Sequence, residues 1–152
     1  MISTKLLHFL TLCGVLLLLS ACVGQIPYTV TPLKDEAKAV IFTQSKPSGC
    51  LFIGEQEGTA RQIQGLSPAQ FADKELLRES ARNDLRNNVL PLINLGKEKR
   101  FLIHVEKELC KITTGVEKNC DNVITQPALL SFQAVEFTSA VKITGGIYEC
   151  RW

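Results

Sequence analysis

Apolar and polar residues alternate along several stretches of the chain, as they do in half-buried β-strands. The clearest stretch is residues 101–109 (FLIHVEKEL). Its alternation predicts an apolar face of Phe101, Ile103, Val105 and Leu109, and a polar face of His104, Glu106 and Glu108. Further strands are predicted at residues 38–44, 50–59, 131–143 and 147–150, with Val135, Phe137, Val141 and Ile143 facing inward. We expect Gly145 and Gly146 to separate the last two strands.

One long helix is predicted at residues 68–90. Ser67 suits the N-cap, Pro68 the first helical position, and Gln70 the position three residues after the cap. Apolar residues then share one face at helical spacing: Phe71, Leu77, Ala81, Leu85 and Val89. Charged neighbours are expected on the exposed flank, namely Glu75 with Arg78 and Glu79 with Arg82. Pro91 should end the helix, because it lacks an amide hydrogen and its ring clashes with the preceding turn.

Together these elements predict an α+β domain, in which one long helix packs on a small, mainly antiparallel sheet. Residues 45–49 are typical of a turn, and residues 96–100 (GKEKR) of a charged, solvated loop. The predicted domain spans residues 38–152, a length that can bury a core as a single unit.

The N-terminus has a different pattern. Lys5 is its only charged residue, a largely apolar run follows at residues 9–19, and Leu19-Ser20-Ala21-Cys22 comes next. A basic region, an apolar core and small residues before a cysteine are typical of a bacterial lipoprotein signal. The apolar run is shorter than the roughly 20 residues that span a bilayer. We therefore predict that residues 1–21 are cleaved and that Cys22 carries lipid. The alternative is a plain signal peptide with a fortuitous cysteine.

A lipidated Cys22 would anchor the chain to a membrane, with residues 22–37 as a short tether that lifts the domain from it. The alternative is that the few apolar residues of this segment pack on the domain. In enteric bacteria an Asp after the lipidated cysteine retains the protein at the inner membrane. Val23 occupies that position here. The sequence thus favours a lipid-anchored protein of the cell envelope, at the outer membrane and facing the periplasm.

The remaining cysteines predict disulfides. Of six cysteines, Cys13 would leave with the signal and Cys22 would be lipidated, which leaves Cys50, Cys110, Cys120 and Cys150. Four cysteines in an oxidising compartment predict two disulfides with three possible pairings. We favour Cys110–Cys120, which closes a short loop, together with Cys50–Cys150, which ties the start of the domain to its end. The sequence has no C-x-x-C motif, so the spacing favours neither zinc nor a redox-active pair.

Catalytic chemistry has little support in the sequence. His104 is the only histidine after the signal, and beside Glu106 it is expected to be a solvated residue rather than a base. No G-x-S-x-G motif is present, and no glycine-rich phosphate loop precedes the helix. The 17 Lys and Arg residues nearly balance the 15 Asp and Glu residues, which argues against a nucleic-acid partner. We predict a protein without enzyme activity, cofactor or metal.

One polar surface is a candidate for partner binding. It is the helix flank formed by Arg82, Asn83, Arg86 and Asn87. These side chains could dock a protein partner, cap loops of the same domain, or face water.

Short motifs resemble a known family. They are Cys50-Leu51-Phe52-Ile53-Gly54-Glu55, the helix segment Ala81-Arg82-Asn83-Asp84-Leu85-Arg86-Asn87, and the terminal Tyr148-Glu149-Cys150. Together with the lipobox they resemble the bacterial lipoprotein family called domain of unknown function 4156, although residues 91–96 depart from its pattern. In outline the chain is also similar to the lipoprotein that senses envelope stress for the Rcs phosphorelay. The resemblance implies a small disulfide-bonded α+β domain on a lipid tether.

The function predicted from the sequence is that of a non-enzymatic envelope lipoprotein that acts through contact with an envelope protein, in sensing or assembly. The alternative is a periplasmic binding module for a small ligand, a lipid or a peptidoglycan fragment, in a crevice between sheet and helix. A hydrolase is a third possibility, and His104 would be its only candidate base.

Overall fold

The computed structural model of the protein describes residues 28–66, 71–96, 98–123 and 137–151. Its elements, with η for a 3-10 helix, are η1 (Glu36–Ala39), β1 (Val40–Thr43), β2 (Leu51–Arg61), α2 (Lys74–Val89), η3 (Leu90–Leu92), β3 (Lys99–Ile112), β4 (Glu117–Asn119), η4 (Cys120–Asn122) and β5 (Thr138–Arg151). No helix within these ranges is long and apolar enough to cross a bilayer. The predicted lipidation residue, Cys22, lies outside the described residues.

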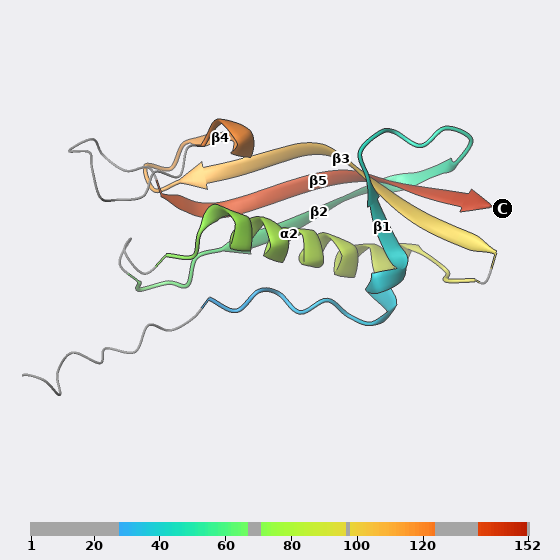
Figure 1. Ribbon diagram of the computed structural model, residues 1–152, viewed down its shortest axis with the longest axis horizontal. Helices are drawn as coiled ribbons and strands as arrows, with labels where there is room; N and C mark the ends of the chain where they lie inside the picture. The colour runs from blue at the N-terminus through green and yellow to red at the C-terminus, as the bar shows by residue number, and fades with distance from the viewer. Residues whose placement is uncertain (1–27, 67–70, 97, 124–136, 152) are drawn as a thin grey trace, which may run out of the picture.

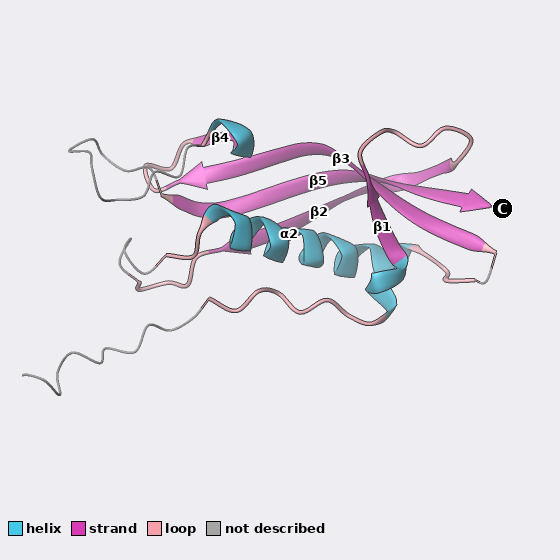
Figure 2. Cartoon of the chain, viewed as in Figure 1, coloured by secondary structure: helices cyan, strands magenta, loops and turns pink. Residues whose placement is uncertain are grey.

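Five strands form one sheet, and α2 packs across one of its faces (Figures 1 and 2). The strand order is β1-β3-β5-β2, and β4 pairs with β3 near its end. β1 runs parallel to β3, whereas the other pairs are antiparallel. The predicted α+β class is therefore confirmed. β1 begins at Val40 rather than at residue 38, because the preceding residues form η1, which buries Ala37.

The core lies between α2 and the sheet. The predicted apolar face of the helix is confirmed in its main part, since Leu77, Ala81, Leu85 and Val89 are all completely buried. They belong to one cluster with residues of the two central strands, including Phe101, Ile103, Val141, Ile143 and Ile147. Full burial of one such side chain contributes about 1.5–3 kcal/mol, so this layer is the main stabilising contact of the domain.

α2 begins later than predicted. Its first residue is Lys74, and the Asp73 carboxylate caps it by accepting a hydrogen bond from the Leu76 amide at 2.8 Å. The predicted cap, residues 67–70, lies outside the described residues, and Phe71 precedes the helix. The reason is tertiary, because the Gln62 side chain binds both the amide and the carbonyl of Ala72 and keeps this segment out of the helix. At the other end, α2 stops at Val89, two residues before Pro91, as predicted.

A bulge in β3 reverses its inward and outward faces. The register with β5 shifts between Val105 and Lys107, so Glu106 is an extra residue. The predicted faces are therefore wrong beyond this point. Leu109 lies on the face away from α2, whereas Glu108 points to the helix, where its carboxylate pairs with Arg78 and lies 3.8 Å from Arg82. The predicted pair of Arg78 with Glu75 is present at 3.3 Å.

Glycines permit close packing in the sheet instead of ending it. β5 is continuous through Gly145 and Gly146, which contradicts the predicted break. A Cβ atom on Gly145 would lie 2.6 Å from the Ile103 side chain. On Gly58 of β2 it would lie 2.2 Å from the Ala81 carbonyl oxygen and 2.4 Å from the Leu85 nitrogen. Gly58 thus allows the backbone of α2 to lie directly on β2.

Both favoured disulfides are present. Cys50–Cys150 joins the start of β2 to the end of β5, across a sequence separation of 100 residues. Cys110–Cys120 joins β3 to η4 across 10 residues, and both of its cysteines are completely buried. The first bridge links the neighbouring strands β2 and β5 at one end of the sheet, and the second attaches η4 to the core.

Candidate functional site

One face of the sheet is covered by α2, and no helix in the described part of the chain covers the other (Figure 2). We call this second side the open face. Val40 and Phe101 are buried in the core, so the residues that follow them, Ile41 and Leu102, point to the open face. The open face is therefore where a sheet residue can meet another molecule.

An apolar row crosses the open face at the end where β2 and β3 begin. Its members are neighbours in register on four adjacent strands: Ile41, Leu102, Tyr148 and Phe52. Ile41 is 47% exposed and Phe52 is 53% exposed. The rings of Phe52 and Tyr148 are 5.4 Å apart at 59°, a tilted arrangement that aromatic pairs favour. Exposed apolar side chains that gather on one face of a sheet are typical of a docking surface.

Gly146 allows the rings of Phe52 and Tyr148 to pack directly against the backbone of the sheet. A Cβ atom there would be 2.8 Å from Glu106 Oε1, 3.2 Å from the Tyr148 ring and 3.3 Å from the Phe52 ring. Tyr148 is only 3% exposed as a result of this packing. The apolar row thus has a rigid, buried centre and exposed ends.

A carboxylate near the end of β5 lies at the same end of the sheet but on the other face, since Glu149 pairs with the core residue Phe101, and two cations hold it there. Lys99 donates a hydrogen bond to Glu149 at 3.0 Å, and Arg151 donates one at 3.2 Å. The hydrogen bond from Lys99 is the main reason that the pKa of Glu149 lies below its usual value. The carboxylate therefore stays ionised, on the face of the sheet opposite the apolar row.

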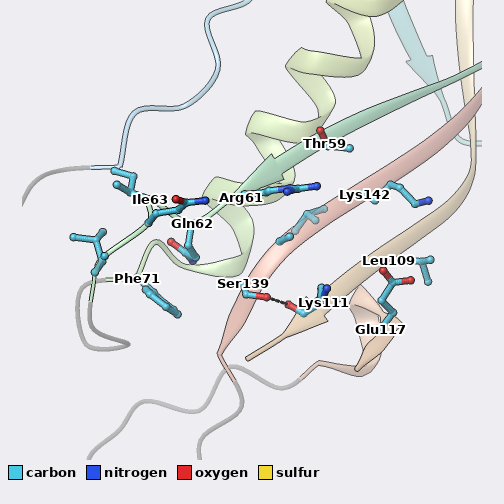
Figure 3. Close-up of a pocket in the computed structure, with 15 residues that line it drawn as sticks. Thr59, Arg61, Gln62, Ile63, Phe71, Leu109, Lys111, Glu117, Ser139 and Lys142 are labelled. Carbon is cyan, nitrogen blue, oxygen red and sulfur yellow. Dashed lines mark hydrogen bonds between the residues drawn. The ribbon is translucent and has the colours of Figure 1, made fainter. Parts of the chain in front are cut away.

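A basic hollow lies at the opposite end of the open face, where β2 and β3 end (Figure 3). Its volume is about 550 Å³, and its lining includes the cations Arg61, Lys111 and Lys142 and the acid Glu117. Lys142 pairs with Glu57 at 3.3 Å. Apolar side chains border it as well, among them Ile63, Phe71 and Leu109. Leu109 reaches the hollow only because of the bulge at Glu106.

The predicted partner-binding flank of α2 binds this chain's own N-terminal segment. Asn83 Nδ2 donates to the Thr31 carbonyl at 2.9 Å, and Asn87 Nδ2 donates to the Pro32 carbonyl at 3.0 Å. Asn87 Oδ1 also accepts from the Lys34 amide. From Tyr28 onward, the predicted tether is therefore packed along the helix. Residues before 38 thus contact the domain, and these asparagines serve as internal contacts.

The two arginines of the flank are likewise used within the domain. The guanidinium carbons of Arg82 and Arg86 lie 5.9 and 4.9 Å from the centre of the Phe42 ring. Burial, and secondarily the charge of Arg82, lower the pKa of Arg86. Cation–π contacts of this kind are worth about 0.5–2 kcal/mol, so the flank stabilises the attachment of β1 to α2.

Replacing Asn87 with alanine should release the N-terminal segment. The change removes the acceptor of the Lys34 amide and the donor to the Pro32 carbonyl. Because the hydrogen bond that this amide loses is worth about 1 kcal/mol net, we expect the Lys34 amide to exchange hydrogen about fivefold faster. Amide exchange followed by NMR or mass spectrometry measures this. Asn94→Ala, at an exposed loop position, is the matched control, and equal exchange in the two variants would contradict the proposed contact.

His104 is half-buried on the open face, and its Nδ1 has no hydrogen-bond partner among the described residues. Nor do the described ranges contain a group of three His, Cys, Asp or Glu side chains placed to bind a metal.

The alternation of apolar and polar residues did not predict the apolar row. Its signal was the apolar residue Leu102 on the otherwise polar face of the strand at residues 101–109. Only the pairing of four strands shows that Leu102 continues into an apolar strip.

No protein-family model matches this chain, and no curated protein or solved structure matches it either. The resemblance carried by residues 50–55, 81–87 and 148–150 therefore stays a prediction.

Proposed function

We propose that this protein is a lipid-anchored envelope protein without enzyme activity, which acts by binding a protein partner through the apolar row. The observation that carries the proposal is the row itself, an ordered apolar strip with exposed ends formed by Ile41 and Phe52. Exposed aromatic and large aliphatic side chains held in place by a packed neighbour are typical of the energetically important part of a protein interface.

The N-terminal sequence and the disulfides support the location. Two disulfides in a domain of this size fit an oxidising compartment such as the periplasm. The lipobox ending at Cys22 supports export and attachment to a membrane. A partner that meets this domain would thus be another protein of the cell envelope, and sensing or assembly is the class of role that fits.

Crosslinking in living cells tests the proposal. Ile41→p-benzoylphenylalanine places a photoreactive group at an exposed end of the apolar row, and Val116→p-benzoylphenylalanine places one at an exposed apolar position of the opposite end. We expect the first to capture one envelope protein, identified by mass spectrometry, and the second not to capture it. Adding Phe52→Asp should reduce the capture about tenfold or more, because a charge placed within an apolar contact costs about 1.4 kcal/mol or more.

Two results would contradict the proposal. One is the same set of captured proteins from both positions, and the other is capture that Phe52→Asp leaves unchanged. A Cys22→Ser variant made in parallel tests the anchor separately. We expect it to leave the membrane fraction, and a Cys22→Ser protein that still fractionates as a processed membrane protein would contradict the lipid anchor.

A further inference from the structure

The described chain begins at the end of the domain that contains the basic hollow. The N-terminal segment runs along α2 in the direction of the helix, since Thr31 bonds to Ser80 and Lys34 bonds to Asn87. Tyr28 therefore lies near the start of α2, where it packs against the core. β2 and β3 also end on this side of the molecule (Figure 1).

The tether between the anchor and Tyr28 is short. This step rests on the lipidation of Cys22 that is part of the proposed function. Only residues 23–27 separate Cys22 from Tyr28. An extended chain spans at most about 3.6 Å per residue, so Tyr28 stays within about 20 Å of the membrane surface. The basic hollow, rather than the apolar row, is then the part of the open face nearest to the membrane.

Chemically, the basic hollow suits a membrane surface. Arg61 and Lys111 form no ion pair within the described residues, so their charges are available to a ligand. Two exposed apolar side chains lie at the same end, Ile63 after β2 and Val116 in the turn after β3. Cationic groups beside exposed apolar side chains are characteristic of proteins that lie at the interface of an anionic bilayer.

We propose that the basic hollow binds the phosphate headgroups of anionic phospholipids in the membrane that carries the anchor. Arg61, Lys111 and Lys142 neutralise the phosphates, while Ile63 and Val116 contact the interfacial region. Each Lys or Arg near an anionic surface increases binding about fivefold. The contact orients the domain, so that the apolar row points away from the membrane and toward a partner.

Lysine labelling of the full lipidated protein in vesicles tests this contact. The protein is reconstituted in vesicles of phosphatidylcholine alone, or of equal parts phosphatidylcholine and phosphatidylglycerol, and acetylated with an amine-reactive ester. We expect Lys111 and Lys142 to be labelled about fivefold more slowly when phosphatidylglycerol is present. Lys46, an exposed residue of the loop between β1 and β2 at the other end, should label equally in both.

A double variant shows whether the protection of Lys142 depends on the other cations of the hollow rather than on the surroundings of Lys142 alone. In Arg61→Glu/Lys111→Glu, the protection of Lys142 by phosphatidylglycerol should disappear, whereas in the control Lys46→Glu it should persist. All of these positions except Lys142 are exposed, so folding should be retained.

Equal labelling of Lys111 and Lys142 in the two kinds of vesicle would overturn the proposal, while a lipid-modified N-terminal peptide in the same sample would leave the anchor standing. Protection by inorganic phosphate added to phosphatidylcholine vesicles, equal to that by phosphatidylglycerol, would also overturn it and assign the hollow to a soluble phosphate compound. Detection of an N-terminal peptide without lipid would contradict the lipid anchor, and with it the orientation of the domain at the membrane.

Discussion

Gly58→Ala is expected to lower the free energy of unfolding by about 3 kcal/mol, the upper part of the range for an overpacked core. The new methyl group would lie 2.2 Å from the Ala81 carbonyl oxygen and 2.4 Å from the Leu85 nitrogen. Both are backbone atoms of α2, which cannot rotate away as a side chain can. The helix would therefore have to move off the sheet.

Moving α2 would also break its polar contacts with β2. Asp84 Oδ2 accepts a hydrogen bond from the Thr59 amide at 2.8 Å, and Asn88 Nδ2 donates to the Glu57 carbonyl at 2.9 Å. These two bonds satisfy backbone groups on the outer edge of β2, which would otherwise be open to pairing with another chain. We thus expect Gly58→Ala to increase aggregation as well as to destabilise the domain.

Gly54→Ala is the matched control for this measurement. Gly54 is in the same strand, and a Cβ atom there would meet no heavy atom within 4 Å. Its effect should stay within about 1 kcal/mol, because only the backbone preference of glycine changes. Urea unfolding followed by circular dichroism, with both disulfides oxidised, compares the two variants. If Gly58→Ala were as stable as Gly54→Ala, the close approach of helix and sheet would be refuted.

Removal of the long disulfide is the second large effect we expect. In Cys50→Ala/Cys150→Ala, the unfolded chain regains the freedom that a cross-link over 100 residues takes from it. The loop-closure estimate for that length is about 4.7 kcal/mol, and measured losses for native disulfides are about 2–5 kcal/mol. The melting temperature should fall by roughly 15 °C, at about 4 °C per kcal/mol for a domain of this size.

The pairing of β2 with β5 should preserve the folded state when the bridge is removed. The chain ends joined by the bridge are already adjacent without it, since Leu51 pairs with Glu149. The native sheet should therefore form in the double variant, and its circular dichroism spectrum at low temperature should match that of the parent. Calorimetry measures the melting temperature. A loss of only a few degrees would mean that the unfolded chain is not limited by this cross-link.

The apolar row and the basic hollow lie at opposite ends of the same face of the sheet. The apolar row lies where β2 and β3 begin, and the basic hollow lies where they end. Both are on the open face, so one domain could contact a membrane with one end of its sheet and a protein with the other. The rigid bridge between them is the central pair of strands, β3 and β5, which stay paired from Lys99 with Arg151 to Ile112 with Thr138.

The sequence by itself determined those features that depend on neighbouring residues. Periodicity was sufficient for the α+β class and for the buried helix face at Leu77, Ala81, Leu85 and Val89, because burial of apolar groups follows the helical repeat. Pro91 was sufficient for the end of α2, because its ring and missing amide act locally. The four cysteines outside the signal limited two disulfides to three pairings, their spacing favoured one of these, and that one is present.

Tertiary structure decided whatever depends on a partner far along the chain. The start of α2 depends on Gln62 binding Ala72, and the role of Asn83 and Asn87 depends on the return of residues 31–34 to the helix. The bulge at Glu106 exchanges the faces of Glu108 and Leu109, because side chains alternate and one extra residue reverses all that follow. The apolar row exists only in the register of four strands. Local patterns indicate which residues are apolar, whereas strand pairing decides which of them meet on an exposed face.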